Sequence, residues 1–323
     1  MKAILLSGGQ GTRLREISGG LPKPMMPLLG KPLLEHIIVH LRQNGFRELC
    51  VTLCYEPDII RRHFGDGGDY GVSITYREET VPLGTAGAAA NCRDFVGDSS
   101  QVLIMSGDCA CDFDLKALAQ SHHSGVTIAL ATHGEPLPYG LVITDRSGRI
   151  TGFLEKPTWE RVVTDQVNTG IYVLSADVLD LIPKAQSYDF ARDLFPRLLR
   201  ENIPMRGVVP EGYWCDIGAP RAYYQCNLDA LDGKLRLYGS GGHARRVLPC
   251  RDRARLMGSL SRALAEFGAD FTDGLTVSDA GGRVHMAPLN DRSALVLEGD
   301  EEAVSRMMLL ARRLDRSERA PDP

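Results

Sequence analysis

The sequence of 323 residues lacks the marks of several classes of protein. It has no excess of basic charge, because 37 Lys and Arg stand against 41 Asp and Glu, and the formal net charge is −4. This balance argues against a general attraction to nucleic acid or to an anionic membrane, so any phosphate must be recognised locally. No apolar run approaches the roughly 20 residues that a membrane-spanning helix needs. We expect no nucleic-acid and no membrane partner.

Signs of secretion are lacking as well. Residues 1–6 are expected to form one short strand that runs into a glycine-rich loop, which does not resemble a signal peptide. The close cysteine pairs, Cys50/Cys54 and Cys109/Cys111, have no second cluster at the spacing of a zinc site. We therefore favour reduced structural thiols over a metal site or a disulfide, and a cytoplasmic location.

The hydrophobic content of 43% and the charged content of 24% are typical of a globular protein with a real core. Up to residue 237, apolar strand-like runs alternate with helical segments. This alternation predicts an α/β fold with a Rossmann-like, mostly parallel sheet and helices on both faces. Strands are expected at 2–6, 49–54, 72–76 and 102–105, with helices at 32–43, 59–63, 86–92, 115–121 and 190–200. Short β runs after Val126 predict an antiparallel extension of the sheet.

A change of composition at Gly239-Ser240-Gly241-Gly242 predicts a second, small α+β domain. We divide the chain into a domain at 1–237, a Gly-rich linker at 238–251, an α-β-β-β-α domain at 252–315 and a polar tail at 316–323. The small domain weakly resembles the last domain of phosphohexomutases, but it lacks their R-x-S-x-T-E-P loop. We expect no mutase activity, and a plain α/β appendage remains the alternative.

The stretch LLSGGQGTRLREISGGLPKP, from Leu5 to Pro24, is a glycine loop that matches neither of the best-known phosphate patterns. It has no third glycine for G-x-G-x-x-G, and no Lys-Ser or Lys-Thr for a P-loop. Backbone N–H groups in such a turn approach an anion closely, and Arg13 is able to hold two phosphate oxygens. A tight turn that needs glycine only for positive φ is the alternative.

The complete set of motifs resembles the sugar nucleotidyltransferase family, in particular enzymes of the mannose-1-phosphate guanylyltransferase type. SGGQGTRL is followed by PKP and GKP, and the resemblance continues to about residue 237. It recurs at PLGTAGA (82–88), SGD (106–108), FLEKP (153–157), NTGIYVLS (168–175) and WCDIGAPRAY (214–223). The family joins a sugar 1-phosphate to an NTP and releases pyrophosphate.

The resemblance implies a role for each matching residue. Arg13, Lys23 and Asp108 would be catalytic, and Asp108 and Asp216 would hold Mg²⁺ through hard carboxylate oxygens. The NTP would be bound by Ser7, Gly8, Gly9, Gly11, Thr12, Arg13 and Gly84. The sugar phosphate would be bound by Gly140, Glu155, Lys156 and Asn168. We consider Asp112 a spare metal ligand and Asp114 a helix N-cap.

PLGTAGA favours GTP as the nucleotide and mannose or manno-heptose 1-phosphate as the acceptor. Thymidylyl or uridylyl transfer to glucose 1-phosphate or another hexose 1-phosphate is the alternative. A non-catalytic sensor of nucleotide sugars on the same fold is the alternative of another class, and a homo-oligomer is possible.

Overall fold

The computed structural model describes residues 1–9, 11–183, 186–237, 243–265, 269–270, 274–279, 282–289 and 293–317. The chain forms two compact units. The first consists of Met1–Ala230 and Lys234–Arg236, and the second of Leu231–Gly233 and Leu237–Pro323. No helix in the described ranges combines the length and the apolarity needed to cross a membrane.

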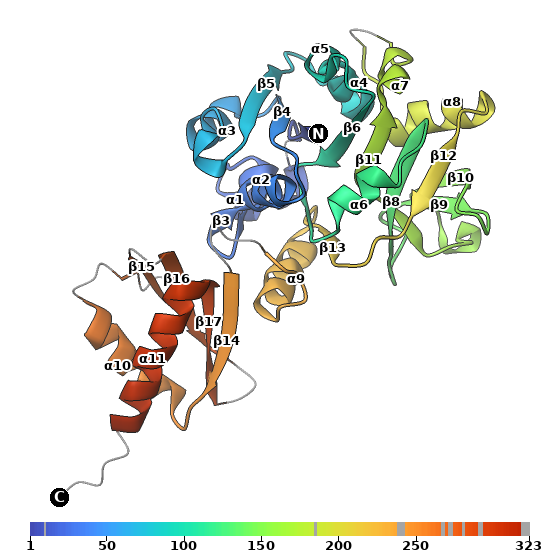
Figure 1. Ribbon diagram of the computed structural model, residues 1–323. Helices are drawn as coiled ribbons and strands as arrows, with labels where there is room; N and C mark the ends of the chain where they lie inside the picture. Colours follow the sequence, from blue (N-terminus) through green and yellow to red (C-terminus); the bar gives the residue numbers. More distant parts are fainter. Residues whose placement is uncertain are drawn as a thin grey trace, which may run out of the picture. The chain divides into compact units, whose positions relative to one another are not determined.

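Four neighbouring parallel strands form one end of the nine-stranded sheet in the first unit (Figure 1). They lie in the order β5 (Ser73–Glu78), β4 (Glu48–Leu53), β1 (Lys2–Leu6) and β6 (Gln101–Ser106). The chain leaves β1 for β4 on one side and later returns to β6 on the other side. The loops that follow β1 and β6 therefore meet at a topological switch point, where sheets of this kind bind ligands.

The antiparallel extension follows β6, as the sequence predicts. β11 (Gln166–Ser175) pairs antiparallel with β6, with β8 (Val126–Thr132) and with β9 (Gly140–Thr144). β10 (Ile150–Glu155) pairs with β9, and β12 (Met205–Val208) runs parallel to β8. The extension brings the ends of β9, β10 and β11 together at the edge where β6 ends.

Helices cover both faces of this sheet, so Ala3, Ile4 and Leu5 of β1 are all fully buried. On one face Ile4 and Ile104 belong to a core that includes Ala86 of α4. The helices are α1 (Arg15–Ser18), α2 (Leu33–Gln43), α3 (Pro57–Phe64), α4 (Gly84–Ala90), α5 (Arg93–Val96), α6 (Leu115–Gln120), α7 (Ala176–Asp180), α8 (Phe195–Arg200) and α9 (Pro220–Leu231).

Two helix predictions can be checked in detail. Asp114 caps α6, because its Oδ1 accepts the N–H of Ala117 at 2.8 Å, as predicted. The single helix expected at 190–200 is instead a π-helical turn, Phe190–Leu194, followed by α8. Pro196 has no N–H to donate within the helix, which explains the change of hydrogen-bonding pattern.

The second unit contains a four-stranded antiparallel sheet in the order β14 (His243–Pro249), β17 (Ala294–Asp300), β16 (Gly282–Pro288) and β15 (Leu275–Asp279). Helices α10 (Arg253–Leu264) and α11 (Glu301–Ser317) share its core through Leu256, Leu260 and Val304.

The prediction of a linker over 238–251 is wrong for residues 243–249. These residues form β14, which pairs with β17 over seven residues, so the element order is β-α-β-β-β-α. The neighbouring glycines and the Arg245-Arg246 pair conceal the strand in the sequence, and its partner lies about fifty residues away. Residues 238–242 of the predicted linker and 318–323 of the predicted tail lie outside the described residues.

Candidate active site

Asp108 and Asp216 converge on one ammonium group. Asp108 lies in the turn after β6, and the next strand, β7 (Cys109–Cys111), pairs antiparallel with β13 (Trp214–Asp216), so Cys109 stands opposite Asp216. Lys23 Nζ lies 2.6 Å from Asp108 Oδ2 and 2.9 Å from Asp216 Oδ1. Burial by itself lowers the pKa of Lys23, but the two carboxylates outweigh it and raise the pKa above its ordinary value.

This geometry suits a divalent cation. Two carboxylate oxygens, one from the turn after β6 and one from β13, already face a single positive charge, and the Lys23 ammonium marks where a cation is favoured. Mg²⁺ commonly takes only one or two carboxylates from a protein and its other ligands from water and phosphate. In the described part of the chain, no group of three or more His, Cys, Asp or Glu side chains forms a closed metal cage. An open site with two ligands therefore fits these residues.

Arg13 lies close to Asp216. A Cβ added to Gly218 would stand 3.1 Å from an Arg13 guanidinium nitrogen and 2.9 Å from Asp216 Oδ1. Gly218 is therefore the place where the arginine and the aspartate approach each other. Its φ is not positive, so the glycine is explained by the space that the two side chains need.

The glycine loop, predicted to bind the NTP, packs against Lys23 and Glu79. Gly11 has a φ of +62°, and a Cβ there would lie 3.0 Å from Lys23 Cβ, so the loop packs on the stem of the lysine. A Cβ on Gly8 would lie 3.3 Å from Glu79 Oε1 and 3.2 Å from Cys54 Cβ. Gly9 has open space around it. The side chain of Thr12 lies outside the described residues.

Ser7 connects the loop after β1 to the turn that carries Asp108. Its side chain is buried, and a Cβ on Gly107 would come within 2.4 Å of Ser7 Oγ. The backbone N–H of Ser7 donates to Thr52 O at 3.2 Å, and that of Gly107 donates to Leu6 O at 2.9 Å. The two loops are therefore in direct contact at the switch point.

Gly84 has a structural reason of its own to be glycine. Its φ is +71°, and a Cβ there would lie 2.7 Å from the carbonyl oxygen of Tyr188. That carbonyl accepts the N–H groups of Ala86 and Gly87 at 2.9 Å each. The backbone carbonyl of Tyr188 thus caps the N-terminus of α4. Contact of Gly84 with a nucleotide base stays a prediction.

The sugar-side residues lie together where β9, β10 and β11 meet. Gly140 pairs with Glu155, and a Cβ on Gly140 would lie 2.9 Å from Glu155 Oε2 and 4.0 Å from Asn168 Cβ. Lys156 follows with a φ of +41°, and its N–H donates to Tyr139 O at 3.2 Å. The structure therefore brings Gly140, Glu155, Lys156 and Asn168 into one neighbourhood.

Tyr139 is one residue that the sequence interpretation missed. Burial is the main cause that raises the pKa of its phenol to about 12, and the charges of Asp216, Lys23 and Arg13 all act on it. Its ring meets Trp214 edge-on with the centroids 5.4 Å apart. Its position directly before Gly140 in the string PYG was the available signal. Glu79, three residues before the PLGTAGA motif begins, and Gly218 were also missed.

The suggestion that Asp112 is a spare metal ligand is wrong. Its side chain is 1% exposed and holds two chain segments together. Asp112 Oδ1 accepts the backbone N–H of Tyr213 at 2.6 Å, and Oδ2 accepts the backbone N–H of Arg236 at 2.9 Å and its Nε at 3.3 Å. Asp112 thus anchors the segment that leads into β13. Both of its carboxylate oxygens already accept hydrogen bonds from the chain, so they do not serve as metal ligands.

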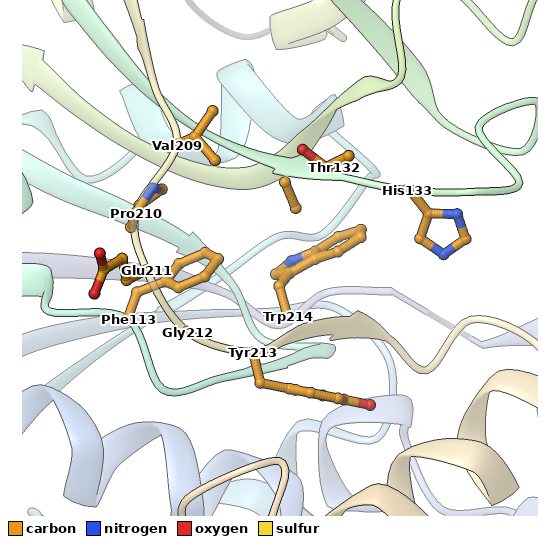
Figure 2. A pocket seen from close by; sticks show the side chains of 10 residues that line it. Phe113, Thr132, His133, Val209, Pro210, Glu211, Gly212, Tyr213 and Trp214 are labelled. Atoms are coloured by element: carbon orange, nitrogen blue, oxygen red, sulfur yellow. The ribbon is translucent and has the colours of Figure 1, made fainter.

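A cavity of about 450 Å³ lies on the Trp214 side of β13 (Figure 2). Aromatic side chains and the 209–212 segment line it, and no lysine or arginine is among the described residues of its lining. The residues are Phe113, Ala131, Thr132, His133, Val209, Pro210, Glu211, Gly212, Tyr213 and Trp214. Trp214 Nε1 donates to Thr169 O at 3.0 Å, so a residue that lines the cavity also contacts β11 next to Asn168.

Comparison with known proteins identifies the family of the chain. The family model described as nucleotidyl transferase matches residues 2–233. A UTP–glucose-1-phosphate uridylyltransferase of Synechocystis sp. is 35% identical over 252 residues, and a mannose-1-phosphate guanylyltransferase of Mycobacterium tuberculosis is 35% identical over 235 residues. These matches cover 73% and 72% of this chain, and the chain spans 65% of the length of each relative.

Solved structures give the same result for the fold. The crystal structure of HddC from Yersinia pseudotuberculosis complexed with GMP-PN has a TM-score of 0.62 and 28% identity. It covers 71% of this chain and 99% of that protein. The residues matched by the family model include each of the motifs around the carboxylate pair, from the glycine loop to WCDIGAPRAY. The chain belongs to the nucleotidyl transferase family.

Proposed function

We propose that the protein transfers a nucleotidyl group from an NTP to a sugar 1-phosphate and releases pyrophosphate. The observation that carries this proposal is the convergence of Asp108 and Asp216 on Lys23 beside the glycine loop. Arg13 reaches the same place next to Gly218. Such a group of charges suits a reaction between two anions, in which positioning and neutralisation matter more than covalent help.

In the proposed reaction, a phosphate oxygen of the sugar 1-phosphate attacks the α-phosphorus of the NTP. The bond from that phosphorus to the oxygen bridging to the β-phosphate breaks, and pyrophosphate leaves with the electron pair. The nucleophile is already an anion, so no side chain has to remove a proton. Arg13 and Lys23 neutralise the phosphates. Asp108 and Asp216 would hold Mg²⁺, which supplies further neutralisation of charge at the α-phosphate.

The sugar 1-phosphate would bind on the other side of the carboxylate pair. Glu155 and Asn168 offer hydrogen-bonding groups to sugar hydroxyls, and the exposed Lys156 offers its ammonium to the phosphate. Gly140 leaves room for the Glu155 carboxylate, because a side chain at 140 would meet it. The mutual position of these residues supports a polar sugar bound between β9, β10 and β11.

GTP is the proposed nucleotide, and Glu79 supports it. Its carboxylate is buried next to Gly8, with Oε2 accepting the N–H of Leu83 at 3.0 Å and Oε1 facing the glycine loop. Glu79 is 8% exposed, and this burial raises the pKa of its carboxyl. A carboxylate accepts hydrogen bonds only, and guanine presents two adjacent donors, N1–H and the 2-amino group. Uracil presents one donor between two acceptors, which an amide suits better.

Mannose or manno-heptose 1-phosphate is the proposed acceptor. Support comes from PLGTAGA and from the relatives described as mannose-1-phosphate guanylyltransferases, such as one from Oryza sativa that is 36% identical over 254 residues. UTP with glucose 1-phosphate is the second candidate pair of substrates, because the relative from Synechocystis sp. is a UTP–glucose-1-phosphate uridylyltransferase.

A pyrophosphate-release panel tests the proposal. Five NTPs are combined with the 1-phosphates of mannose, glucose, manno-heptose and N-acetylhexosamine in the presence of Mg²⁺. Release with GTP and mannose or manno-heptose 1-phosphate is expected. Release only with UTP or dTTP and glucose 1-phosphate would replace the proposed substrates. No release with any pair would favour a sensor of nucleotide sugars.

Glu79→Gln sharpens the same panel. Loss of a charged, buried acceptor costs about 1.5–3 kcal/mol, so kcat/KM for GTP should fall roughly 10- to 150-fold. The values for UTP and dTTP should fall less or rise, because an amide also donates. Glu78→Gln, an exposed neighbour, is the matched control. An unchanged ratio of GTP to UTP in Glu79→Gln would remove Glu79 from base selection.

A further inference from the structure

The Lys23 ammonium occupies the space between the two carboxylates that would hold the metal. It lies within 2.9 Å of an oxygen from each, and its side chain is only 8% exposed. The stem of Lys23 packs on Gly11, and Lys23 begins a 3-10 turn that Pro22 precedes and that contains Pro24. The ammonium is therefore a buried, well-held counter-ion of the carboxylate pair.

A metal ion and this ammonium cannot use the same oxygens at once. Mg²⁺ binds oxygen at about 2.1 Å, so an ion between Asp108 and Asp216 would lie almost on the Lys23 nitrogen. The charges lead to the same conclusion. Two carboxylates and the two cations Lys23 and Arg13 sum to zero, so a divalent ion alone would leave an excess of two positive charges.

A triphosphate changes this balance. It brings up to four negative charges beside the glycine loop, and an NTP together with one divalent ion still adds net negative charge. Lys23 and Arg13 then have phosphate oxygens as new partners, and the carboxylates become available to the metal. If Lys23 left the carboxylates without a metal arriving, Asp108 and Asp216 would lose their counter-ion. If a metal bound without phosphate, the buried Lys23 ammonium would lose its partners. Neither event is favourable alone.

We propose that Lys23 holds the metal position in the ligand-free protein and exchanges its carboxylate partners for phosphate when NTP and metal arrive together. Asp108 and Asp216 consequently bind a divalent ion with the nucleotide and not before it. The lysine thus serves twice, first as a stand-in for the cation and then as a phosphate ligand. This inference rests on the proposed function, since it takes the nucleotide to be the partner that releases Lys23.

The test measures metal binding directly, without catalysis. Mn²⁺ is titrated into the full chain, and free Mn²⁺ is followed by electron paramagnetic resonance, with and without a non-hydrolysable GTP analogue. The triphosphate itself binds Mn²⁺, so the Mn²⁺ held by the analogue alone is measured without protein and subtracted. After this subtraction the wild-type protein should bind Mn²⁺ at least about 10-fold more weakly without the analogue than with it. Equal affinity in both states overturns the proposal, and this arm needs no variant.

Lys23→Met is the second arm. Removal of the ammonium leaves two facing carboxylates, so Mn²⁺ affinity without nucleotide should rise at least about 10-fold, and Mn²⁺ should raise Tm more than in the wild type. Lys23→Arg keeps the charge and should stay close to the wild type. Lys234→Met removes another 2.6 Å Lys–Asp pair, with Asp229, away from the carboxylate pair, and should leave Mn²⁺ binding unchanged. Failure of Lys23→Met to gain affinity overturns the proposal.

The outcome is separable from that of the proposed function. If no NTP and sugar 1-phosphate pair releases pyrophosphate but Lys23→Met binds Mn²⁺ more tightly, the lysine is a counter-ion of a metal site in a protein with another function. If the panel is active and the gain is absent, the transferase stands and the exchange is wrong.

Discussion

Lys23 and Lys156 are both assigned to a phosphate by family resemblance, but their surroundings differ. Lys23 is 8% exposed and is held by two carboxylates at 2.6 and 2.9 Å. Lys156 is 57% exposed, and its nearest described carboxylate, Glu155, lies 4.0 Å away. Lys23, proposed for the nucleotide, is thus held in place by the protein, whereas Lys156, proposed for the sugar phosphate, presents its charge to solvent.

This difference matters for the two substrates. A buried charge in a set geometry acts strongly on a ligand because water does not screen it, but it has to be neutralised until the ligand comes. An exposed lysine needs no resident partner and gives a weaker, salt-sensitive contribution. We expect changes on the nucleotide side to reduce kcat, and changes on the sugar side to act mainly on KM for the sugar 1-phosphate.

The largest effect is expected from Asp108→Asn. An amide keeps the shape but removes the negative charge that would hold Mg²⁺, so Mg²⁺-dependent pyrophosphate release should fall at least about 1000-fold. Circular dichroism and Tm are measured together with turnover, and the fold should remain intact. Turnover near that of the wild type would exclude Asp108 as a metal ligand and would remove the contrast between the two sides.

Gly218→Ala should have the next largest effect. The added methyl group would meet Asp216 at 2.9 Å and Arg13 at 3.1 Å and push these side chains apart. Misplacement of reacting groups by about 1 Å costs roughly 100-fold, so kcat should fall by that order and the Mg²⁺ requirement should rise. KM for the sugar 1-phosphate should not change.

Gly134→Ala is the matched control for this change, because a Cβ at 134 has no neighbour within 4 Å. It should leave kcat, KM and Tm unchanged. A Gly218→Ala protein with a lower Tm but normal Mg²⁺ dependence would show that Gly218 serves the fold and not the site.

The smallest effect is expected from Lys156→Met. Loss of an exposed charge should raise KM for the sugar 1-phosphate roughly 10-fold and leave KM for the NTP unchanged. Added salt should also raise KM for the sugar 1-phosphate in the wild type, because the Debye screening length falls to about 3 Å in 1 M salt and exposed charges then attract the phosphate less. Lys116→Met, in the exposed part of α6, is the control. An equal rise in both KM values would contradict the division into two sides.

The sequence predicted the first unit well where its signals are local. The apolar run of β1 and the Asp114 cap of α6 need only neighbouring residues, and both are present in the structure. The family motifs identified Lys23 and the two aspartates together, although their positions are spread over almost two hundred residues. The strand β14 was missed because pairing with a distant edge, and not its own composition, makes it a strand.

Asp112 and Glu79 show what sequence reasoning did not resolve. Asp112 is four residues from Asp108 and of the same type, yet its partners are two backbone segments that only the folded chain brings to it. Glu79 follows β5 without any motif of its own, but its carboxylate lies beside Gly8 of the glycine loop. A carboxylate is the same chemical group in both cases, and burial and partners decide what it does.

The sequence alone determined the family, the parallel sheet and the residue types that bear charge, because these follow from local patterns and ordered motifs. The tertiary structure decided which charges meet. The pairing of β7 with β13 sets Asp216 beside Asp108, and the packing of Lys23 on Gly11 directs its ammonium between them. Contacts between residues so far apart along the chain depend on strand register and side-chain packing, which no single segment of the sequence contains.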